Sequence, residues 1–297
     1  MDFPLVCVLS ILCVTVLTPS AAAFAEADTD EEVTKLLRQS TLAAQSGDIE
    51  TAITLASDAI TRFPKSTDAY DLRARLHAAK EEYRKSISDF SQVIKLNPKS
   101  PDAYDRRGDQ YFKMGKFKEA IADYDRFLAF RPTFEPRHWR RGIAYYYAAK
   151  YVKGQKQFEG YQTFDSNDVE NAVWRYLCMA RHSDVKKARS TILKIGDDRR
   201  VPMRQVYELF AGNLKPDDVL NAAKAGDPPP DALNRRLFYA HLYLGLFYEV
   251  EKNVDLANKH IGLAAKEHRI GHFMWDVARV HAEVLRTTTR DLKKSDR

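Results

Sequence analysis

The fold of this chain is decided by residues 101–132, which read PDAYDRRGDQYFKMGKFKEAIADYDRFLAFRP. Apolar and aromatic side chains recur there at the spacing of amphipathic α-helices, in two runs that meet at Gly115. Gly108 in the first run and Ala120 in the second are small, so the two helix backbones can approach closely. Pro132 ends the second run, because proline cannot continue a helix. The stretch therefore predicts two short antiparallel helices.

The same pattern recurs at a fixed interval of 34 residues before and after this stretch. The residues that keep the interval are Pro64, Pro98 and Pro132; Tyr70 and Tyr104; Tyr83, Phe117 and Tyr151; Phe90, Tyr124 and Phe158; and Gly108 and Gly142. In this period of helix–turn–helix units the chain resembles tetratricopeptide repeat (TPR) proteins. The resemblance implies an all-α fold, a right-handed superhelix (α-solenoid) of antiparallel helix pairs in which each repeat packs on its neighbours.

The period also divides the chain into segments. Four repeats are expected over residues 33–166, and the first has no aromatic residue in its first helix, which is typical of a capping repeat. The period loosens over residues 167–230, which predict irregular, degenerate helical repeats that end in a non-helical Gly-Asp-Pro-Pro-Pro connector. The other expected segments are an acidic N-terminal stretch, a late TPR-like unit with a capping helix, and a disordered tail: residues 26–32, 231–286 and 287–297.

An apolar segment, residues 3–17, precedes the repeats. Its length is that of a signal-peptide core, and Ala23-Phe24-Ala25 supplies an A-x-A cleavage site. The segment before this core holds Asp2 and no basic residue. Two outcomes stay open: residues 1–25 are a signal peptide that is removed, or they are retained as a membrane anchor. The short apolar run favours removal. We expect an exported protein, either periplasmic or secreted, or anchored by this segment.

Charge and cysteine content indicate which partners and which disulfides are to be expected. The formal net charge of +6 is spread along the sequence rather than gathered in one basic run, so no nucleic-acid binding is expected. Charged residues make up 30% of the chain and aromatic residues 11%, a composition typical of an ordered protein. Cys7 and Cys13 lie in the apolar N-terminal segment, and only Cys178 would remain after its removal. No disulfide is therefore expected within the mature chain.

Catalytic and metal-binding motifs are absent from the sequence. His268, His272 and His281 do not have the H-E-x-x-H spacing of a helical metal site. Cys178 and His182 lie four residues apart, but Cys178 falls where a repeat needs a small packing residue, so a buried structural thiol is the favoured interpretation. There is no glycine-rich phosphate loop and no G-x-S-x-G motif, and no pair of carboxylates falls in an expected pocket. We expect no enzymatic activity, no metal and no cofactor.

In the TPR family, the first helix of each repeat lines a concave groove. The family's groove positions fall on an acidic section of this sequence, followed by an aromatic one. They are Asp68, Asp71, Arg75, Asp102, Asp105, Asp109, Phe112, Trp139, Ile143, Tyr146 and Tyr147. Such a groove suits a protein or extended peptide segment with basic and apolar residues, because Trp and Tyr are frequent anchors of binding sites. The alternative is that these aromatic side chains pack on other helices of the same chain.

The order of segments resembles exported bacterial TPR proteins of the NlpI lipoprotein type. The shared features are an export signal, repeats, an irregular middle, the late unit YLGLFYE at residues 243–249, and a closing helix. The resemblance implies a non-enzymatic scaffold or adaptor for protein–protein interactions in the cell envelope, and a homodimer. Lipid anchoring is not carried over, because neither Cys7 nor Cys13 lies in a lipobox. The alternatives are a structural envelope protein that self-associates, and an exported hydrolase that uses residues 169–230.

Overall fold

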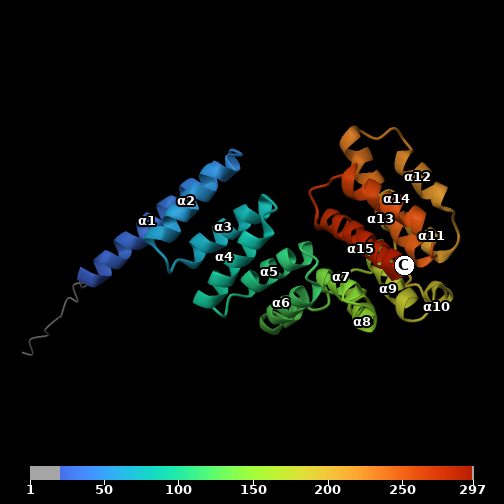
Figure 1. The fold of residues 1–297 in the computed structure, drawn as a ribbon, viewed down its shortest axis with the longest axis horizontal. Coiled ribbons are helices and arrows are strands. Elements are labelled where there is room, and N and C mark those ends of the chain that lie inside the picture. The colour runs from blue at the N-terminus through green and yellow to red at the C-terminus, as the bar shows by residue number, and fades with distance from the viewer. Residues whose placement is uncertain (1–20, 296–297) are drawn as a thin grey trace, which may run out of the picture. The chain divides into compact units, whose positions relative to one another are not determined.

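The computed structural model describes residues 21–295, and it describes the surroundings of side chains for residues 31–287. Over that range it contains fifteen α-helices, one short 3-10 helix and no strand, which confirms the all-α prediction (Figure 1). Most of the expected signal or anchor segment, residues 1–20, lies outside the described residues. Within the described part, no helix combines the length and the apolar character needed to span a bilayer.

The chain divides into two compact units, with the boundary after Arg73. In the first unit, α1 (Ala21–Gln45) and α2 (Ile49–Arg62) form an antiparallel pair, followed by the first half of α3 (Thr67–Ala79). Its small core contains Leu36, Ala59 and Ala69. The acidic stretch at residues 26–32, expected to be a separate segment, is instead part of α1.

The second unit begins with the remainder of α3 and continues the helix pairs predicted from the 34-residue period. These helices are α4 (Tyr83–Leu96), α5 (Pro101–Lys113), α6 (Phe117–Phe130), α7 (Trp139–Tyr147) and α8 (Tyr151–Tyr161), with the 3-10 helix η1 (Pro132–Phe134) before α7. The repeated glycines explain the close pairing. A Cβ atom placed on Gly108 would lie 2.7 Å from the Tyr124 ring, and one on Gly142 would lie 2.7 Å from the Phe158 ring. Each glycine thus makes room for the aromatic side chain of the following helix.

The irregular middle contains short helices and an extended loop. Its helices are α9 (Val169–His182), α10 (Val185–Ser190), α11 (Met203–Ala211) and α12 (Pro216–Lys224), and no helix covers residues 191–202. Cys178 on α9 is fully buried, in agreement with a packing role, and this burial raises the pKa of its thiol, so the reactive thiolate is disfavoured.

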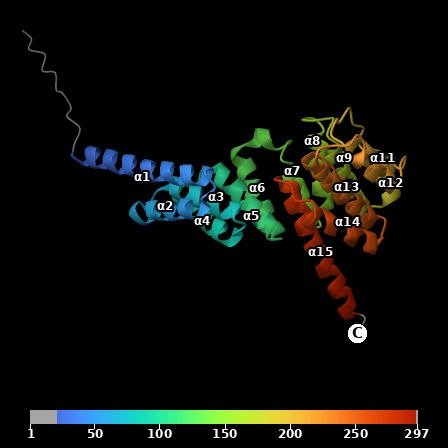
Figure 2. The same cartoon turned by 90° about the horizontal axis from the view of Figure 1, so that it is seen from above.

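The late unit consists of α13 (Pro230–Val250) and α14 (Val254–Lys266), and α15 (Phe273–Ser295) follows it. The expected tail at residues 287–297 is helical as far as Ser295, which differs from the disordered tail predicted from its polar composition. Figure 2 shows α15 beside α14 and passing α5, and both contacts are present in the structure. The closing helix therefore packs on its sequence neighbour and also on a repeat far earlier in the chain.

Candidate functional site

The acidic section of the predicted groove is held in an internal ion-pair network. The Arg140 guanidinium donates from Nη2 to Asp105 at 2.6 Å and from Nη1 to Asp109. His138 Nε2 lies 2.9 Å from Asp105, and the Tyr124 hydroxyl donates to Asp109 at 2.8 Å. Burial raises the pKa of Asp109. Burial acts in the same direction on Asp105, but the His138 hydrogen bond and the Arg140 charge outweigh it and lower the Asp105 pKa. Both carboxylates are therefore already bonded to partners within the chain.

The other charged groove residues lie nearer the solvent. Asp68 is exposed and Asp71 is half-buried, and both belong to the first unit. Arg75 and Asp102 in the second unit are exposed. Of the predicted acidic residues, Asp68 and Asp102 are therefore the most accessible to a partner.

The aromatic section is covered by other helices of the same chain, and α15 is one of them. Phe112, Ile143 and Tyr146 are buried, at 0%, 1% and 4% exposure. Phe273 on α15 reaches this section, with its ring centroid 5.1 Å from that of Phe112. Tyr146 packs on Trp174 of α9, with ring centroids 5.4 Å apart. The structure thus places these aromatic residues in internal packing, the alternative that the sequence left open, because α9 and the returning α15 both pack on them.

The edge of this section remains partly accessible. Tyr147 and Trp139 are half-buried. The Tyr147 hydroxyl lies 2.9 Å from Nδ1 of His281 on α15, and the Trp139 ring centroid lies 5.6 Å from that of Phe273. Trp139 therefore packs against α15 on one side, while another part of its surface lines a cavity.

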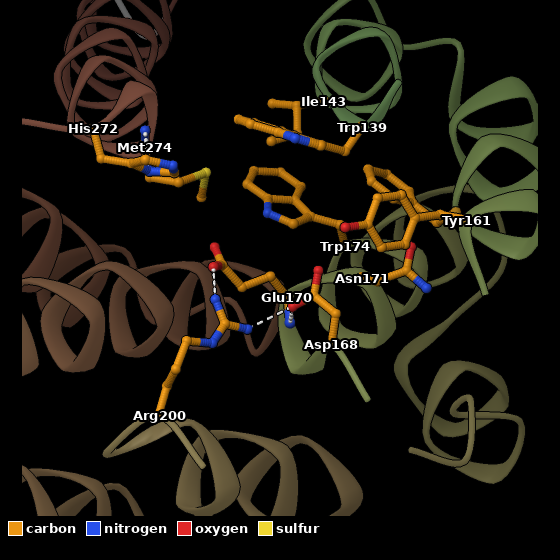
Figure 3. Close-up of a pocket in the computed structure, with 11 residues that line it drawn as sticks. Trp139, Ile143, Tyr161, Asp168, Glu170, Asn171, Trp174, Arg200, His272 and Met274 are labelled. Atoms are coloured by element: carbon orange, nitrogen blue, oxygen red, sulfur yellow. Dashed lines mark hydrogen bonds and ion pairs between the residues drawn. The ribbon is translucent and has the colours of Figure 1, made fainter. Parts of the chain in front are cut away.

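That cavity, which we call the α9 pocket, lies where α7, α8, α9 and the start of α15 meet, and has a volume of about 190 Å³. Its walls combine aromatic rings with a charged cluster (Figure 3). The lining residues are Trp139, Ile143, Phe158, Tyr161, Asp168, Glu170, Asn171, Trp174, Arg200, His272 and Met274. The sequence reasoning placed no paired carboxylates in a pocket. The structure corrects this, because Asp168 and Glu170 both line the cavity from the start of α9.

Arg200 organises the charged side of the α9 pocket from the loop before α11. Its guanidinium donates to Glu170 at 2.7 Å and to Asp168 at 2.6 Å. It also donates to Asp198 at 2.6 Å, so three carboxylates surround one cation. Asp168 caps α9 by accepting from the backbone N–H of Glu170 at 3.1 Å. The side chain of Arg200 is 47% exposed.

Negative charge in the pocket exceeds positive charge, and this affects Glu170 most. Burial, and then repulsion from Asp168, raise the pKa of Glu170 to about 7. Burial also raises the pKa of Asp168. The Tyr243 hydroxyl on α13 donates to Glu170 Oε2 at 2.6 Å. Glu170 is thus bonded through both carboxylate oxygens, Oε1 to Arg200 and Oε2 to Tyr243.

The three histidines considered from the sequence do not converge. His268 contacts Asn234 at 3.0 Å, the His272 ring stacks on Trp139, and His281 contacts Tyr147. No group of side chains in the described part of the chain is arranged to hold a metal ion. A different histidine pair does form: Nδ1 of His241 on α13 lies 2.8 Å from Nδ1 of His260 on α14.

The His241–His260 pair predicts acid sensitivity. Burial, then the nearby His260 and His268, lower the pKa of His241 to about 4. Since an unfolded histidine has a pKa of about 6.5, the stability contribution of neutral His241 is complete above pH 6.5 and is lost as the pH falls toward 4. Between pH 6.5 and pH 4, we expect the unfolding free energy of His241→Gln to fall less than that of the unsubstituted protein, by up to about 3 kcal/mol. Urea unfolding at a series of pH values measures this, and His182→Gln, at an exposed histidine, is the control.

Comparison with protein families identifies the repeats. Family models described as "Tetratricopeptide repeat" match residues 37–101 and 101–134, the region in which the structure has paired helices α1 to α6. Residues 37–134 of the chain are tetratricopeptide repeats. No curated protein matches its sequence.

Solved structures support the TPR fold. A tetratricopeptide repeat protein from Parabacteroides merdae ATCC 43184 is 12% identical, with a TM-score of 0.55 over 86% of this chain and 99% of that one. YrrB, described as a TPR protein with an unusual peptide-binding site, is 15% identical, with a TM-score of 0.50 over 57% of this chain and 87% of that one. A MamA double mutant is 18% identical, with a TM-score of 0.50 over 53% and 89%. Likeness at these identities shows the fold alone.

Sequence reasoning on the TPR pattern missed the charged side of the α9 pocket. Asp168, Glu170 and Arg200 lie in the irregular segment, where the TPR period assigns no groove positions. Asp168 and Glu170 straddle the start of a helix, which is a local signal for a cap rather than for a pocket. Only the fold brings Arg200 to them, so their proximity was not visible in the sequence.

Proposed function

We propose that this TPR protein is a non-enzymatic adaptor that binds protein or peptide segments of other proteins in an exported compartment. The observation that carries the proposal is the TPR array itself, a repeat fold that presents extended surfaces to partners. A protein of the same fold, YrrB, has a peptide-binding site. Export is supported by the apolar residues 3–17 and the A-x-A site that follows them, and the NlpI-type resemblance favours the cell envelope.

The chemistry of the partner follows from the accessible groove residues. Asp68 and Asp102 are exposed and acidic, each in the first turn of the first helix of its repeat. A segment with basic residues complements them. Most of the aromatic section is closed by α15, so the apolar contacts of a partner are expected at the half-buried Trp139 and at the α9 pocket.

The carboxylates of the α9 pocket raise the question of catalysis, and their bonding favours binding. A general acid or base needs a carboxyl oxygen within reach of a substrate proton. Both oxygens of Glu170 are already bonded, to Arg200 and to Tyr243. Oδ1 of Asp168 accepts both from the backbone N–H of Glu170 in the cap of α9 and from Arg200. This arrangement fits a site that fixes a charged group better than one that transfers its proton.

Partner capture tests the adaptor proposal. We expect the tagged protein to retain specific proteins from an envelope extract, and Asp68→Lys with Asp102→Lys to reduce their recovery roughly tenfold at low salt. The reduction should diminish near 1 M salt, where the Debye length is about 3 Å. Mass spectrometry of the retained proteins measures the recovery.

The matched control for this experiment is Asp255→Lys. Asp255 is also exposed and also lies in the first turn of a helix, but that helix is α14, outside the predicted groove. Recovery that falls equally in the control, or that does not change in the groove variant, contradicts the predicted partner chemistry. If no protein is retained, the adaptor proposal itself fails.

A further inference from the structure

The α9 pocket has a charge imbalance that a ligand could correct. Asp168, Glu170 and Asp198 surround Arg200, so three carboxylates face one guanidinium. The His272 imidazole in the wall does not offset this excess, because burial lowers its pKa and favours the neutral form. Burial, and then repulsion from Asp168, raise the pKa of Glu170. A bound cation would stabilise the ionised form of both carboxylates that line the pocket.

A second, independent observation is an unpartnered donor. Trp174 is only 1% exposed, and its indole Nε1–H is buried without a hydrogen-bond partner. In Figure 3 this nitrogen faces the space between Met274 and the Glu170 carboxylate. A buried N–H without an acceptor costs about 1–3 kcal/mol in general. The pocket therefore lacks an acceptor as well as a cation.

The size of the pocket limits what can supply both groups. Its volume of about 190 Å³ lies below the roughly 300–1,000 Å³ of pockets for drug-sized ligands. The occupant is therefore about as large as one amino-acid residue. Trp139, Tyr161 and Phe158 give one side of the cavity an apolar, aromatic surface.

We propose that the α9 pocket binds the free N-terminus of a partner polypeptide. The α-ammonium group lies between Asp168 and Glu170, the first carbonyl oxygen accepts from Trp174 Nε1, and the first side chain packs on the aromatic wall. The N-terminus of a chain combines a cation with an acceptor a few bonds away, in a volume of one residue. A lysine side chain supplies the cation without the acceptor. This inference rests on the proposed role as a protein-binding adaptor, and it names the part of the partner that is recognised.

The test uses L-leucinamide, which carries the free amine, the carbonyl oxygen and an apolar side chain, but no carboxylate. The ¹⁵N-labelled full-length protein has three tryptophans, so its NMR spectrum contains three indole N–H signals. We expect leucinamide to shift the Trp174 signal, assigned with Trp139→Phe and Trp275→Phe, and N-acetyl-L-leucinamide to bind at least tenfold more weakly. Acetylation removes the positive charge and keeps the rest of the probe.

Two variants remove pocket charge while they keep local structure. Asp168→Asn retains a good helix cap, and Glu170→Gln can still accept from Tyr243. Each should weaken leucinamide binding about tenfold, while Glu251→Gln, which alters a carboxylate paired with Arg189 outside the pocket, should not. The other indole signals report whether each variant is folded.

Three results would overturn the inference. The first is that leucinamide leaves all indole signals in place, the second that N-acetyl-L-leucinamide binds equally well, and the third that n-butylamine binds as tightly as leucinamide. The last result would mean that any amine suffices and that the carbonyl acceptor has no role. Each of these is separate from the adaptor proposal, which depends on partner capture: partners retained without leucinamide binding refute only the N-terminus site, and leucinamide binding without retained partners refutes only the adaptor role.

Discussion

Arg140→Leu is expected to destabilise the second unit by about 3–5 kcal/mol, the usual cost of removing one partner of a buried ion pair. Asp105 and Asp109 both bond to Arg140, and each is only 18% exposed. Without the guanidinium, their charges are left close together in a poorly solvated site. Urea unfolding followed by circular dichroism measures the loss as a shift in midpoint.

Two further variants show whether the loss comes from uncompensated charge. Adding Asp109→Asn to Arg140→Leu should recover part of the stability, because one of the stranded carboxylates is then neutral. Arg199→Leu removes an arginine that is 91% exposed and should change stability by less than about 0.5 kcal/mol. If Arg140→Leu changes the unfolding free energy as little as Arg199→Leu does, the ion-pair network contributes little to stability. Asp105 and Asp109 are then again candidates for partner binding.

Ending the chain after Ile270, which deletes α15, is expected to unfold the second unit rather than to open a working groove. Met274, Val277, Val280 and Leu285 on this helix are buried, and each such side chain contributes about 1.5–3 kcal/mol. Their sum is comparable with the whole stability of a domain, about 5–15 kcal/mol. Thermal unfolding and sedimentation of the truncated chain should show a large loss of stability and aggregation through the exposed aromatic section.

The contrary outcome is informative. A truncated chain that keeps its melting temperature, stays monomeric and binds more partner would mean that α15 occupies the groove as a removable inhibitor. A dimeric full-length protein that becomes a stable monomer on truncation would favour the structural, self-associating alternative.

A smaller change, Phe273→Ala, removes only the ring that contacts Phe112. It should lower the unfolding free energy by about 3–5 kcal/mol if that ring is part of the core.

The helix pairs could be predicted from the sequence because their determinants are local. Gly108 faces Tyr124 and Gly142 faces Phe158 within single repeats, so a pattern that repeats every 34 residues reports directly on the packing. The same logic explains Cys178, whose sulfur lies close to Gly154 on the preceding helix, at a place where a larger side chain would not fit. Periodicity therefore predicted which residues are small and which helices pair.

Whether the groove residues are open to a partner or buried could not be predicted in this way, because their burial depends on contacts between distant parts of the chain. Tyr147 meets His281 across 134 residues, and Arg279 donates to the Lys113 carbonyl oxygen across 166 residues. A repeat pattern contains no information on where a closing helix lies. The α9 pocket has the same origin, since Arg200 reaches Asp168 and Glu170 from a loop outside the repeat period.

The return of α15 also limits how this protein can evolve. Repeat arrays usually gain and lose units by duplication and deletion, because each repeat contacts only its neighbours. Here Asp276 on α15 bonds to Lys113 on α5 at 3.1 Å, so the helices between them must place both residues at that distance. One added or missing repeat between α5 and α15 would separate them. Insertions in loops and substitutions at the surface would leave this contact intact.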